Sequence, residues 1–321
     1  MAHNPAQGVF FYDYQAPDHT LSQRLLQGLQ AVRKHLNLPF NHTDAGRSLF
    51  ARISQSTDYY LPHTELALLQ QHLPILQGQM PAGAVLFELG INNSQMLNAL
   101  FSALRPAVYV PVDDRRDALY EAALAARQLW PELEIHAACQ DFAALRSLPS
   151  QVPVHLPRIG FYSGAGLESM PPERLQMFFS NSRQLLGEDG CLIVGMDLDK
   201  DAAELRSIYQ DNQGLFAELN YQQLRDTNTR LDAGFVPERF SYGLVVEPAL
   251  HCLSMGLFSV MDQVLQVAGQ SISLRRKEWL QTGSLYQYSP DGLLELARST
   301  GYMARHFWTD PEQRYGLFVL E

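Results

Sequence analysis

The feature that most constrains the fold is a regular alternation of short apolar runs with helical segments between residues 84 and 197. The apolar runs end at turn-forming or polar residues and are too short for helices, which is typical of buried strands. They cover residues 84–89, 107–113, 133–139, 158–163 and 191–197. The segments between them have helical spacing over residues 94–104, 115–129 and 172–186. Strands joined by crossover helices form a parallel sheet with helices on both faces, so the sequence predicts an α/β fold.

Beyond Asp197 the pattern changes. Residues 200–231 have the spacing of two helices, broken near residues 212–214. Extended runs follow over residues 240–246, 252–260 and 263–274, and their near-alternation of apolar and polar residues favours an antiparallel sheet. The earlier rhythm returns at Ser289, with a helix to Ser299 and final strands over residues 303–309 and 315–320.

These patterns divide the chain into two expected domains. One comprises residues 66–197 and 289–321 and carries the parallel sheet. The other comprises residues 1–65 and 198–288, because the first 65 residues are helical in pattern, poor in strands and expected to pack with the insertion. A chain of 321 residues is long enough for one large core and one smaller core.

Charge and composition exclude several classes of function. The net charge is −10, and the one dense basic cluster, residues 275–277, has Glu278 beside it. This balance argues against a nucleic-acid surface, which needs a basic stripe. No apolar run is long enough to span a membrane, and the first residues lack the features of a secretory signal, so we expect a cytoplasmic protein. The three cysteines form no CxxC pair and the histidines have no ligand spacing, so no metal site is predicted.

Three strand ends carry groups that suit a nucleoside, because ligands of open α/β sheets bind beyond the carboxyl ends of the strands. The first run ends at residues 88–90 (ELG), where a turn leads into a helix. The second ends at Asp113, whose carboxylate suits the two hydroxyls of a ribose. The third is followed by Asp141 and Phe142, which suit an adenine amino group and the face of its ring. This order favours S-adenosylmethionine, which has a ribose and an adenine but no phosphates.

Each of these signals has a structural alternative. Gly90 alone is as common in strand–helix turns as at ligands. Asp113 would also serve as a cap for the following helix, and Asp141 before Phe142 is a common pairing of a helix cap with a core aromatic. We favour the ligand role for Asp113, and for Asp141 both alternatives stay open.

Several stretches of the chain, in their order and spacing, resemble the histidine-specific methyltransferase family. This family includes the enzyme that trimethylates the α-amine of L-histidine in ergothioneine synthesis. The resemblance runs from about residue 36 to residue 321. It is carried by residues 44–50 (DAGRSLF), 58–65 (DYYLPHTE), 87–90 (FELG), 109–113 (YVPVD), 195–201 (GMDLDKD), 209–214 (YQDNQG) with Asn220, and 307–311 (FWTDP).

The resemblance implies a Rossmann-like class I methyltransferase sheet with an inserted α+β substrate-recognition domain. It implies methyl transfer from S-adenosylmethionine to an amine, for which the protein mainly supplies placement and a group that takes or orients the amine's proton. The cofactor contacts that we assign are Glu88, Gly90, Asn92, Asp113, Asp141 and Phe142. The substrate is expected between the two domains, and the contacts that we assign to it are Tyr60, Glu168, Tyr209, Met255, Ser284 and Tyr288, with Tyr60 and Tyr209 as the catalytic pair.

The glycine loop departs from the family pattern. Asn92 replaces the second glycine; it tolerates a left-handed backbone but adds bulk where the cofactor approaches. Met96 replaces the lysine that is expected to meet the methionine carboxylate. Loss of one charge-assisted hydrogen bond costs about 1.5–3 kcal/mol, so we expect cofactor binding that is weaker by roughly ten- to a hundredfold.

The substrate positions depart further. Glu168 aligns with the family's Asn that holds the substrate carboxylate, and two carboxylates face each other unfavourably unless one takes a proton. The family's Glu-x-Ser is altered within residues 282–288 (TGSLYQY): the Glu is absent, and the Ser is either Leu285 or, with a one-residue slip, Ser284. Met255 keeps an apolar family position. L-histidine is therefore not the expected substrate.

Two kinds of function fit these departures. One is an S-adenosylmethionine-dependent N-methyltransferase for another small amine or amino-acid-like molecule, with Glu168 attracting the positive charge of the amine. The alternative is a catalytically inactive relative that acts through a protein partner or by binding a metabolite. Asn92 and Met96 favour the inactive alternative, whereas Asp113 and Asp141 favour the enzyme. The enzyme is the function that we predict.

Overall fold

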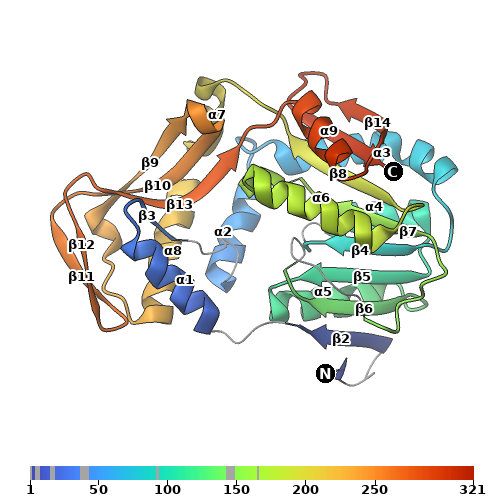
Figure 1. The fold of residues 1–321 in the computed structure, drawn as a ribbon, viewed down its shortest axis with the longest axis horizontal. Helices are drawn as coiled ribbons and strands as arrows, with labels where there is room; N and C mark the ends of the chain where they lie inside the picture. The colour runs from blue at the N-terminus through green and yellow to red at the C-terminus, as the bar shows by residue number, and fades with distance from the viewer. Residues whose placement is uncertain are drawn as a thin grey trace. The chain divides into compact units, whose positions relative to one another are not determined.

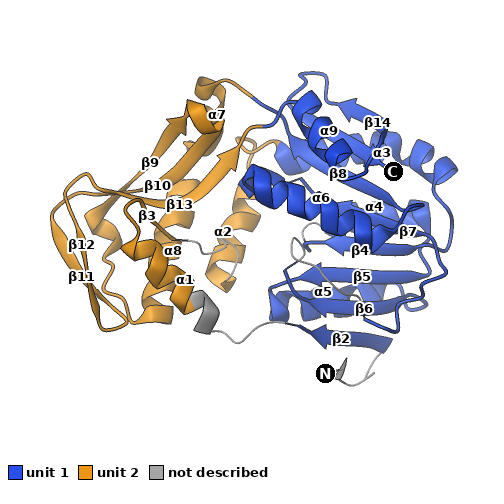
Figure 2. Cartoon of the chain, viewed as in Figure 1, with its two compact units in different colours: residues 1–15, 61–199, 288–321 blue, residues 16–60, 200–287 orange. Residues whose placement is uncertain are grey.

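The structure is a computed structural model that describes residues 2–3, 8–14, 19–36, 43–91, 94–141, 149–164 and 166–321. The chain forms two compact units, coloured separately in Figure 2. Unit 1 comprises Met1–Gln15, Leu61–Asp199 and Tyr288–Glu321, and unit 2 comprises Ala16–Tyr60 and Lys200–Gln287.

Among the described residues, unit 1 is built on a nine-stranded sheet with the order β1-β2-β6-β5-β4-β7-β8-β15-β14 (Figure 1). The strands are β1 Ala2–His3, β2 Val9–Asp13, β4 Val85–Leu89, β5 Val108–Asp113, β6 Glu134–Cys139, β7 Arg158–Tyr162, β8 Cys191–Asp197, β14 Ala304–Thr309 and β15 Tyr315–Leu320. From β2 to β8 neighbouring strands are parallel, whereas β15 is antiparallel to both β8 and β14. Strands β4, β5 and β8 are buried along their whole length, as in a sheet covered on both faces.

The order β6-β5-β4-β7-β8 is the 3-2-1-4-5 order of a Rossmann sheet, counted from β4. The predicted Rossmann-like α/β fold is therefore confirmed. The order reverses between β4 and β7, so the crevice in which such sheets bind ligands lies beyond the carboxyl ends of these two strands.

Helices cover both faces of this sheet. They are α3 Leu61–Gln79, α4 Ser94–Leu104, α5 Arg116–Leu129, α6 Pro172–Leu186 and α9 Pro290–Ser299, with the 3₁₀ turn η3 Leu167–Ser169. Helices α6 and α9 lie on the face nearer the viewer in Figure 1, and α3, α4 and α5 lie on the other. Phe178 and Phe179 of α6 and Leu293 of α9 join a core cluster with the apolar side chains of the central strands. Burial of these aromatic side chains fixes α6 across the sheet.

The boundaries of the two units differ from the expected domains at the start of the chain. We expected residues 1–65 to pack with the insertion, whereas β2 belongs to the large sheet, where it pairs in parallel with β6. Its sequence, Val-Phe-Phe-Tyr-Asp, is apolar on both sides, and Phe11 and Tyr12 are buried. From the sequence alone, this short run indicates no more than a strand or a docking segment within a pattern that is otherwise helical. The role of unit 2 in substrate recognition stays a prediction.

Unit 2 combines helices with a small sheet. The helices are α1 His19–Gln30, α2 Asp44–Gln55, α7 Ala202–Tyr209 and α8 Leu215–Leu231, with the 3₁₀ turns η4 Pro237–Arg239 and η5 Pro248–Leu250. The sheet has the order β3-β13-β10-β9, from β3 Lys34–His35, β9 Phe240–Glu247, β10 Cys252–Ser259 and β13 Trp279–Tyr286. A separate hairpin joins β11 Gln263–Val267 to β12 Gln270–Leu274.

The predicted break between two helices is confirmed, because Gly214 has a φ of +67° between α7 and α8. The predicted antiparallel pairing is confirmed for β9 with β10. The expected run over residues 263–274 is instead a hairpin that turns at Ala268 and Gly269, both with positive φ. Strand β13 was not predicted, because its apolar residues do not alternate regularly.

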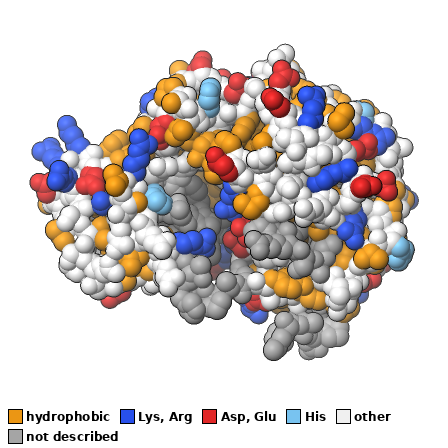
Figure 3. Space-filling view, in the orientation of Figure 1, with side chains coloured by type: hydrophobic (Ala, Val, Ile, Leu, Met, Phe, Trp, Pro, Cys, Tyr) orange, Lys and Arg blue, Asp and Glu red, His pale blue; other side chains and the backbone are white. Residues whose placement is uncertain are grey.

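The surface carries mixed charge. On the face drawn in Figure 3, the Lys and Arg side chains of the described residues are interspersed with Asp and Glu side chains. In the part of the chain that the structure describes, no helix has both the length and the apolar character needed to cross a membrane.

Candidate functional site

The turn after β4 connects the first two predicted strand ends. Gly90 has a φ of +86°, a conformation that costs an L-residue with a side chain roughly 1–2 kcal/mol. Its N–H donates to the carbonyl of Val112 in β5, at 2.7 Å. The next N–H, of Ile91, then points at the carboxylate of Asp113, with a nitrogen-to-oxygen distance of 3.0 Å. The glycine therefore brings the loop after β4 against the end of β5.

Asp113 ends β5, and its side chain is almost completely buried. Its Oδ2 accepts hydrogen bonds from the N–H of Ile91, at 3.0 Å, and from Nη2 of Arg115, at 2.7 Å. Its Oδ1 accepts from the N–H and the Nε of Arg115, both at 2.8 Å. The same Nη2 also donates to the carbonyl of Ile91, at 2.7 Å. The guanidinium of Arg115 therefore ties the carboxylate to the loop after β4.

Asp141 follows β6 and is held differently. Nη2 of Arg174, in α6, donates to both of its carboxylate oxygens, at 3.1 and 3.2 Å. The side chains of this pair are 41% and 47% exposed, so the ion pair contributes at most about 1 kcal/mol. The structure thus brings Gly90, Asp113 and Asp141 to one edge of the sheet.

The other predicted cofactor residues have different environments. Glu88 is buried within β4 and accepts a hydrogen bond from the hydroxyl of Tyr109 in β5. Burial raises the pKa of Tyr109, and the charge of Glu88 raises it further. Asn92 and Phe142 lie outside the described residues. Met96, where the resemblance implies a lysine in the family, is buried in α4.

A cluster of buried acids lies where β7 and β8 end. Glu65 of α3 accepts hydrogen bonds from Oγ of Ser163, at 2.6 Å, and from the N–H of Gly164, at 2.9 Å. Glu168, in the turn η3, accepts from the N–H of Gly166, at 3.0 Å. Asp197, at the end of β8, is fully buried, and Glu65 and Glu168 are nearly so.

Burial changes the protonation of these acids. It raises the pKa of Glu65 to about 7, although the hydrogen bonds from Ser163 and Gly164 lower it. Burial, together with the negative charge of Asp197, raises the pKa of Glu168 to about 8. Two acids that exchange protons near neutral pH are therefore present at the carboxyl ends of the strands, where proton transfer with a bound amine is chemically possible.

Tyr60 and Tyr209, the predicted catalytic pair, belong to unit 2. The ammonium of Lys200 lies 5.5 Å from the ring centroid of Tyr60, within the range of a cation–π interaction. Tyr209 is buried, and its ring packs edge-on against Phe216, with the centroids 5.0 Å apart. These contacts orient both rings and leave their catalytic role a prediction.

The remaining predicted substrate contacts occur in both units. In unit 2, Met255 is buried in β10, opposite Gly283 of β13. Oγ of Ser284 accepts a hydrogen bond from Nε2 of Gln281, at 2.6 Å. In unit 1, the hydroxyl of Tyr288 donates to the carbonyl of Met170, at 2.9 Å.

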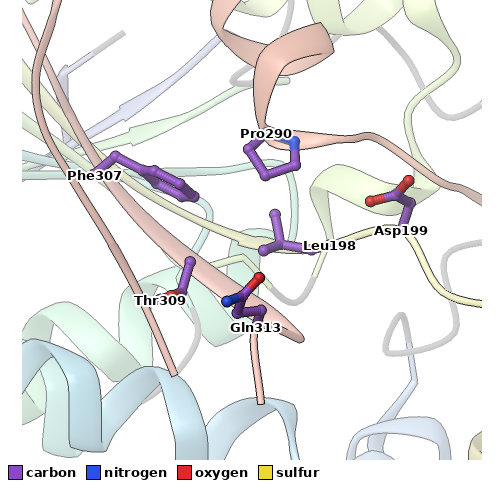
Figure 4. Close-up of a pocket in the computed structure, with 6 residues that line it drawn as sticks. All are labelled: Leu198, Asp199, Pro290, Phe307, Thr309 and Gln313. Carbon is purple, nitrogen blue, oxygen red and sulfur yellow. The ribbon is translucent and has the colours of Figure 1, made fainter. Parts of the chain in front are cut away.

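A cavity of about 470 Å³ lies elsewhere in unit 1, by the start of α9 and the end of β14 (Figure 4). It is lined by Leu198, Asp199, Pro290, Phe307, Thr309 and Gln313. None of these six is a predicted site residue. The described residues contain no group of three or more His, Cys, Asp or Glu side chains that could hold a metal ion.

Sequence reasoning missed three residues that shape the site. Glu65 and Asp197 fall within stretches that carry the family resemblance, and this was the available signal. Arg115 gave none, because an arginine two positions after a strand is typical of a helix start. Its role depends on the direction of the side chain, which the structure supplies.

A Rossmann sheet with acids beyond adjacent strand ends defines a nucleoside-binding α/β protein. A family model described as "Histidine-specific methyltransferase, SAM-dependent" matches residues 21–321, and the chain belongs to this family. The resemblance inferred from the sequence is therefore confirmed.

Relatives support this membership. The chain is 27% identical over 297 residues to a histidine N-alpha-methyltransferase from Mycolicibacterium smegmatis, with 90% of this chain and 91% of that protein covered. It is 24% identical over 311 residues to N-methyltransferase fsqC from Aspergillus fumigatus, with 93% and 82% covered. A solved S-adenosylmethionine-dependent methyltransferase from Clostridium acetobutylicum aligns with 86% of this chain and 98% of its own, at 12% identity and a TM-score of 0.49.

The family is S-adenosylmethionine-dependent, so S-adenosylmethionine is the cofactor. Its ribose hydroxyls and adenine amino group are hydrogen-bond donors, and Asp113 and Asp141 present acceptors at neighbouring strand ends. S-adenosylmethionine has no phosphate, so its site needs no basic side chain to bind one. The types of side chain at this edge of the sheet therefore fit the cofactor.

Proposed function

We propose that this protein is an S-adenosylmethionine-dependent N-methyltransferase whose acceptor is a small amine that lacks a carboxylate beside the reacting nitrogen. The observation that carries the proposal is the acidic cluster of Glu65, Glu168 and Asp197, which is buried where β7 and β8 end. Glu168 aligns with the residue that holds the substrate carboxylate in the family.

The cofactor side of the proposal assigns roles to three residues. Asp113 would accept from the ribose, Asp141 would accept from the adenine amino group, and the turn at Gly90 would let the backbone come close to the ligand. S-adenosylmethionine supplies a methyl group on a positively charged sulfur. The chain has only to hold the acceptor nitrogen in line with that methyl group and free of its proton.

The acceptor side depends on charge. An amine arrives as an ammonium ion, and a positive charge beside Glu168 favours the carboxylate form of that side chain. The carboxylate then binds the ammonium and provides an acceptor for the proton that must leave before attack. A substrate carboxylate would instead bring a further negative charge beside Glu168 and Asp197, which disfavours L-histidine.

Tyr60 and Tyr209 are proposed to orient the amine, and Met255, Ser284 and Tyr288 to contact the rest of the acceptor. The names of the relatives support the reaction class, since they include a histidine N-alpha-methyltransferase and fungal N-methyltransferases. They leave the acceptor of this chain open.

Cofactor binding is tested first, by calorimetric titration with S-adenosylmethionine and S-adenosylhomocysteine. The Asp141→Ala variant should bind roughly tenfold more weakly, because one hydrogen bond to the adenine is lost. Asp141 is exposed, so the fold should be retained. Glu132→Ala, at another exposed acid just before β6, is the matched control and should bind as the wild type does.

The acceptor class is tested with L-histidine and histamine, which differ only in the carboxylate, by mass spectrometry of the methylated product. The wild type should prefer histamine, and Glu168→Asn should reduce that preference at least about tenfold, the effect of one charged contact. Equal rates with both acceptors, or a preference for L-histidine, would contradict the proposed acceptor class.

One observation favours the inactive alternative: Arg115 already occupies the carboxylate of Asp113. Absence of detectable binding of either cofactor form at millimolar concentration would support that alternative and reject the methyltransferase proposal.

A further inference from the structure

We propose that Arg115 is the residue that sets cofactor affinity in this chain, because its guanidinium competes with the ribose for Asp113. The inference rests on the proposed function and adds to it a residue that the family resemblance does not assign.

The carboxylate of Asp113 can accept only a limited number of hydrogen bonds. A carboxylate offers about four lone-pair positions to hydrogen-bond donors. In Asp113 four donors already use them: the N–H groups of Ile91 and Arg115, and the Nε and Nη2 atoms of Arg115. Two ribose hydroxyls can therefore bind Asp113 only if two of these donors leave.

Only the side-chain donors are able to leave the carboxylate of Asp113. The N–H of Ile91 is directed by the turn at Gly90, and the N–H of Arg115 directly follows the end of β5, so both are fixed by the backbone. The two guanidinium bonds depend only on side-chain torsions. Arg115 is 13% exposed, so a path toward solvent exists for its head group. Cofactor binding thus requires the guanidinium of Arg115 to rotate away from Asp113.

Exchange of the guanidinium for ribose hydroxyls at Asp113 has a cost in free energy. The guanidinium makes two charge-assisted bonds to Asp113 and one bond to the carbonyl of Ile91. A ribose hydroxyl also makes a charge-assisted bond to a carboxylate, because one ionised partner is enough. The hydroxyls carry no positive charge, however, so they replace neither the attraction between the opposite charges of this buried pair nor the bond to the carbonyl of Ile91. Replacing the guanidinium by ribose hydroxyls therefore removes more stabilisation than it restores. The difference in free energy lowers the affinity for the cofactor.

The pair at the adenine position behaves differently. Arg174 and Asp141 are each more than two-fifths exposed, and such a pair separates at little cost. The competition is therefore specific to the ribose end of the site, where the ion pair between Arg115 and Asp113 is buried.

The test compares Arg115→Ser with Arg116→Ser by calorimetric titration of S-adenosylhomocysteine. Arg116 is the neighbouring arginine, but it is 55% exposed and bonds to Asp13, so its loss leaves Asp113 untouched. We expect Arg115→Ser to bind about tenfold more tightly than the wild type or better, and Arg116→Ser to bind within about twofold of it. Arg115→Lys keeps the charge without the planar fork and should lie between.

A second measurement separates competition from a general structural effect. Adenosine and 2′,3′-dideoxyadenosine differ only in the hydroxyls that Asp113 would hold. The wild type should discriminate little between them, since each hydroxyl displaces an arginine bond. The ratio of their dissociation constants should increase about tenfold in Arg115→Ser. A merely looser fold would change both affinities together.

The outcomes distinguish this inference from the proposed function. If the wild type binds the cofactor and Arg115→Ser binds it more weakly, Arg115 is a cofactor contact and the inference is wrong, while the methyltransferase proposal stands. An unchanged ratio for the two nucleosides also overturns it. If neither protein binds any of these ligands, both proposals fail. Binding that is detectable only in Arg115→Ser supports the inference.

Discussion

The residues that give unit 1 its chemistry are carboxylic acids that the fold buries. Glu65 and Glu168 have pKa values raised to about 7 and about 8, chiefly by burial. Each therefore binds its proton more tightly in the folded chain than in the unfolded one. Between an unfolded pKa near 4.5 and these folded values, the folded state holds more protons. The stabilisation is fully present below that unfolded pKa and is lost as the pH rises through the folded values.

We expect the free energy of unfolding to decrease between pH 5 and pH 8.5 by an amount on the order of a few kcal/mol. Urea denaturation across this range measures it. Glu168→Gln removes one of the two groups and should flatten the dependence above pH 7. Glu295→Gln, at an exposed position of α9, is the control and should follow the wild type. A wild-type stability that rises steadily to pH 8.5 would contradict the expected direction.

Gly195 of β8 leaves space for the buried acids. A Cβ at this position would clash with Oε1 of Glu65 and with the hydroxyl of Tyr315. Gly195→Ala should destabilise the protein by about 1–3 kcal/mol, because an overpacked core must shift one of these side chains. Gly234→Ala, where a Cβ would meet nothing, should change stability by less than about 0.5 kcal/mol. Equal denaturation midpoints for the two variants would show that the acids move aside freely.

At the scale of elements, Asp201 caps the N-terminus of α7. It is the last residue of the stretch 195–201 that carries the family resemblance. Asp201 accepts hydrogen bonds from the N–H groups of Ala203 and Glu204, both at 2.8 Å. Asp201→Ala leaves two helix-end donors without this partner and should cost about 0.5–2 kcal/mol. Asp201→Asn keeps a capping oxygen and should cost much less. Thermal unfolding of the two variants measures the difference, and similar losses would mean that charge rather than capping matters there.

The elements that the sequence predicted share one property: burial imposes a recognisable pattern of apolar residues over several consecutive positions. Strands β4 and β8 are buried on both faces, and each is a run of apolar residues, interrupted in β4 only by Glu88, that ends at a turn or an acid. Strand β13 lacks this signal, since its buried and half-buried positions include Gly283 and Thr282. Its place in the sheet depends on pairing with β10 and with β3, and β3 lies far away in sequence.

Of the site, the sequence predicted the residues whose role follows from position along a strand. Asp113 and Asp141 stand just at or beyond strand ends, and the structure brings them to one edge. It missed what depends on side-chain direction and long-range packing. Arg115 is a partner of Asp113 only because its guanidinium turns back on the carboxylate. Glu65 joins the site only because α3 packs beside the end of β7.

At the scale of the whole molecule, the proposed cofactor residues all belong to unit 1. Saturation with S-adenosylhomocysteine at about 100 times its dissociation constant should stabilise the state that binds it by about 2.7 kcal/mol. Hydrogen exchange should therefore slow at Gly90, Asp113 and Asp141, and should stay unchanged in the hairpin of β11 and β12. Mass spectrometry of the exchanged peptides measures this. Protection confined to unit 2 would contradict the assignment of the cofactor to unit 1.

The position of β2 beside β6 has a consequence for how the chain is made. A ribosome finishes residue 13 of β2 and reaches residue 134 of β6 only 121 positions later. At roughly 5–20 residues per second this interval lasts about 6–24 s. During that time the nascent segment Val-Phe-Phe-Tyr-Asp lacks its parallel partner β6 and has only the two-residue strand β1 to pair with, while the residues of α1, α2 and β3 emerge behind it. Strand β2 is thus a late addition to the parallel part of its sheet, so a faithful fold depends on keeping this apolar segment from pairing elsewhere until β6 has been translated.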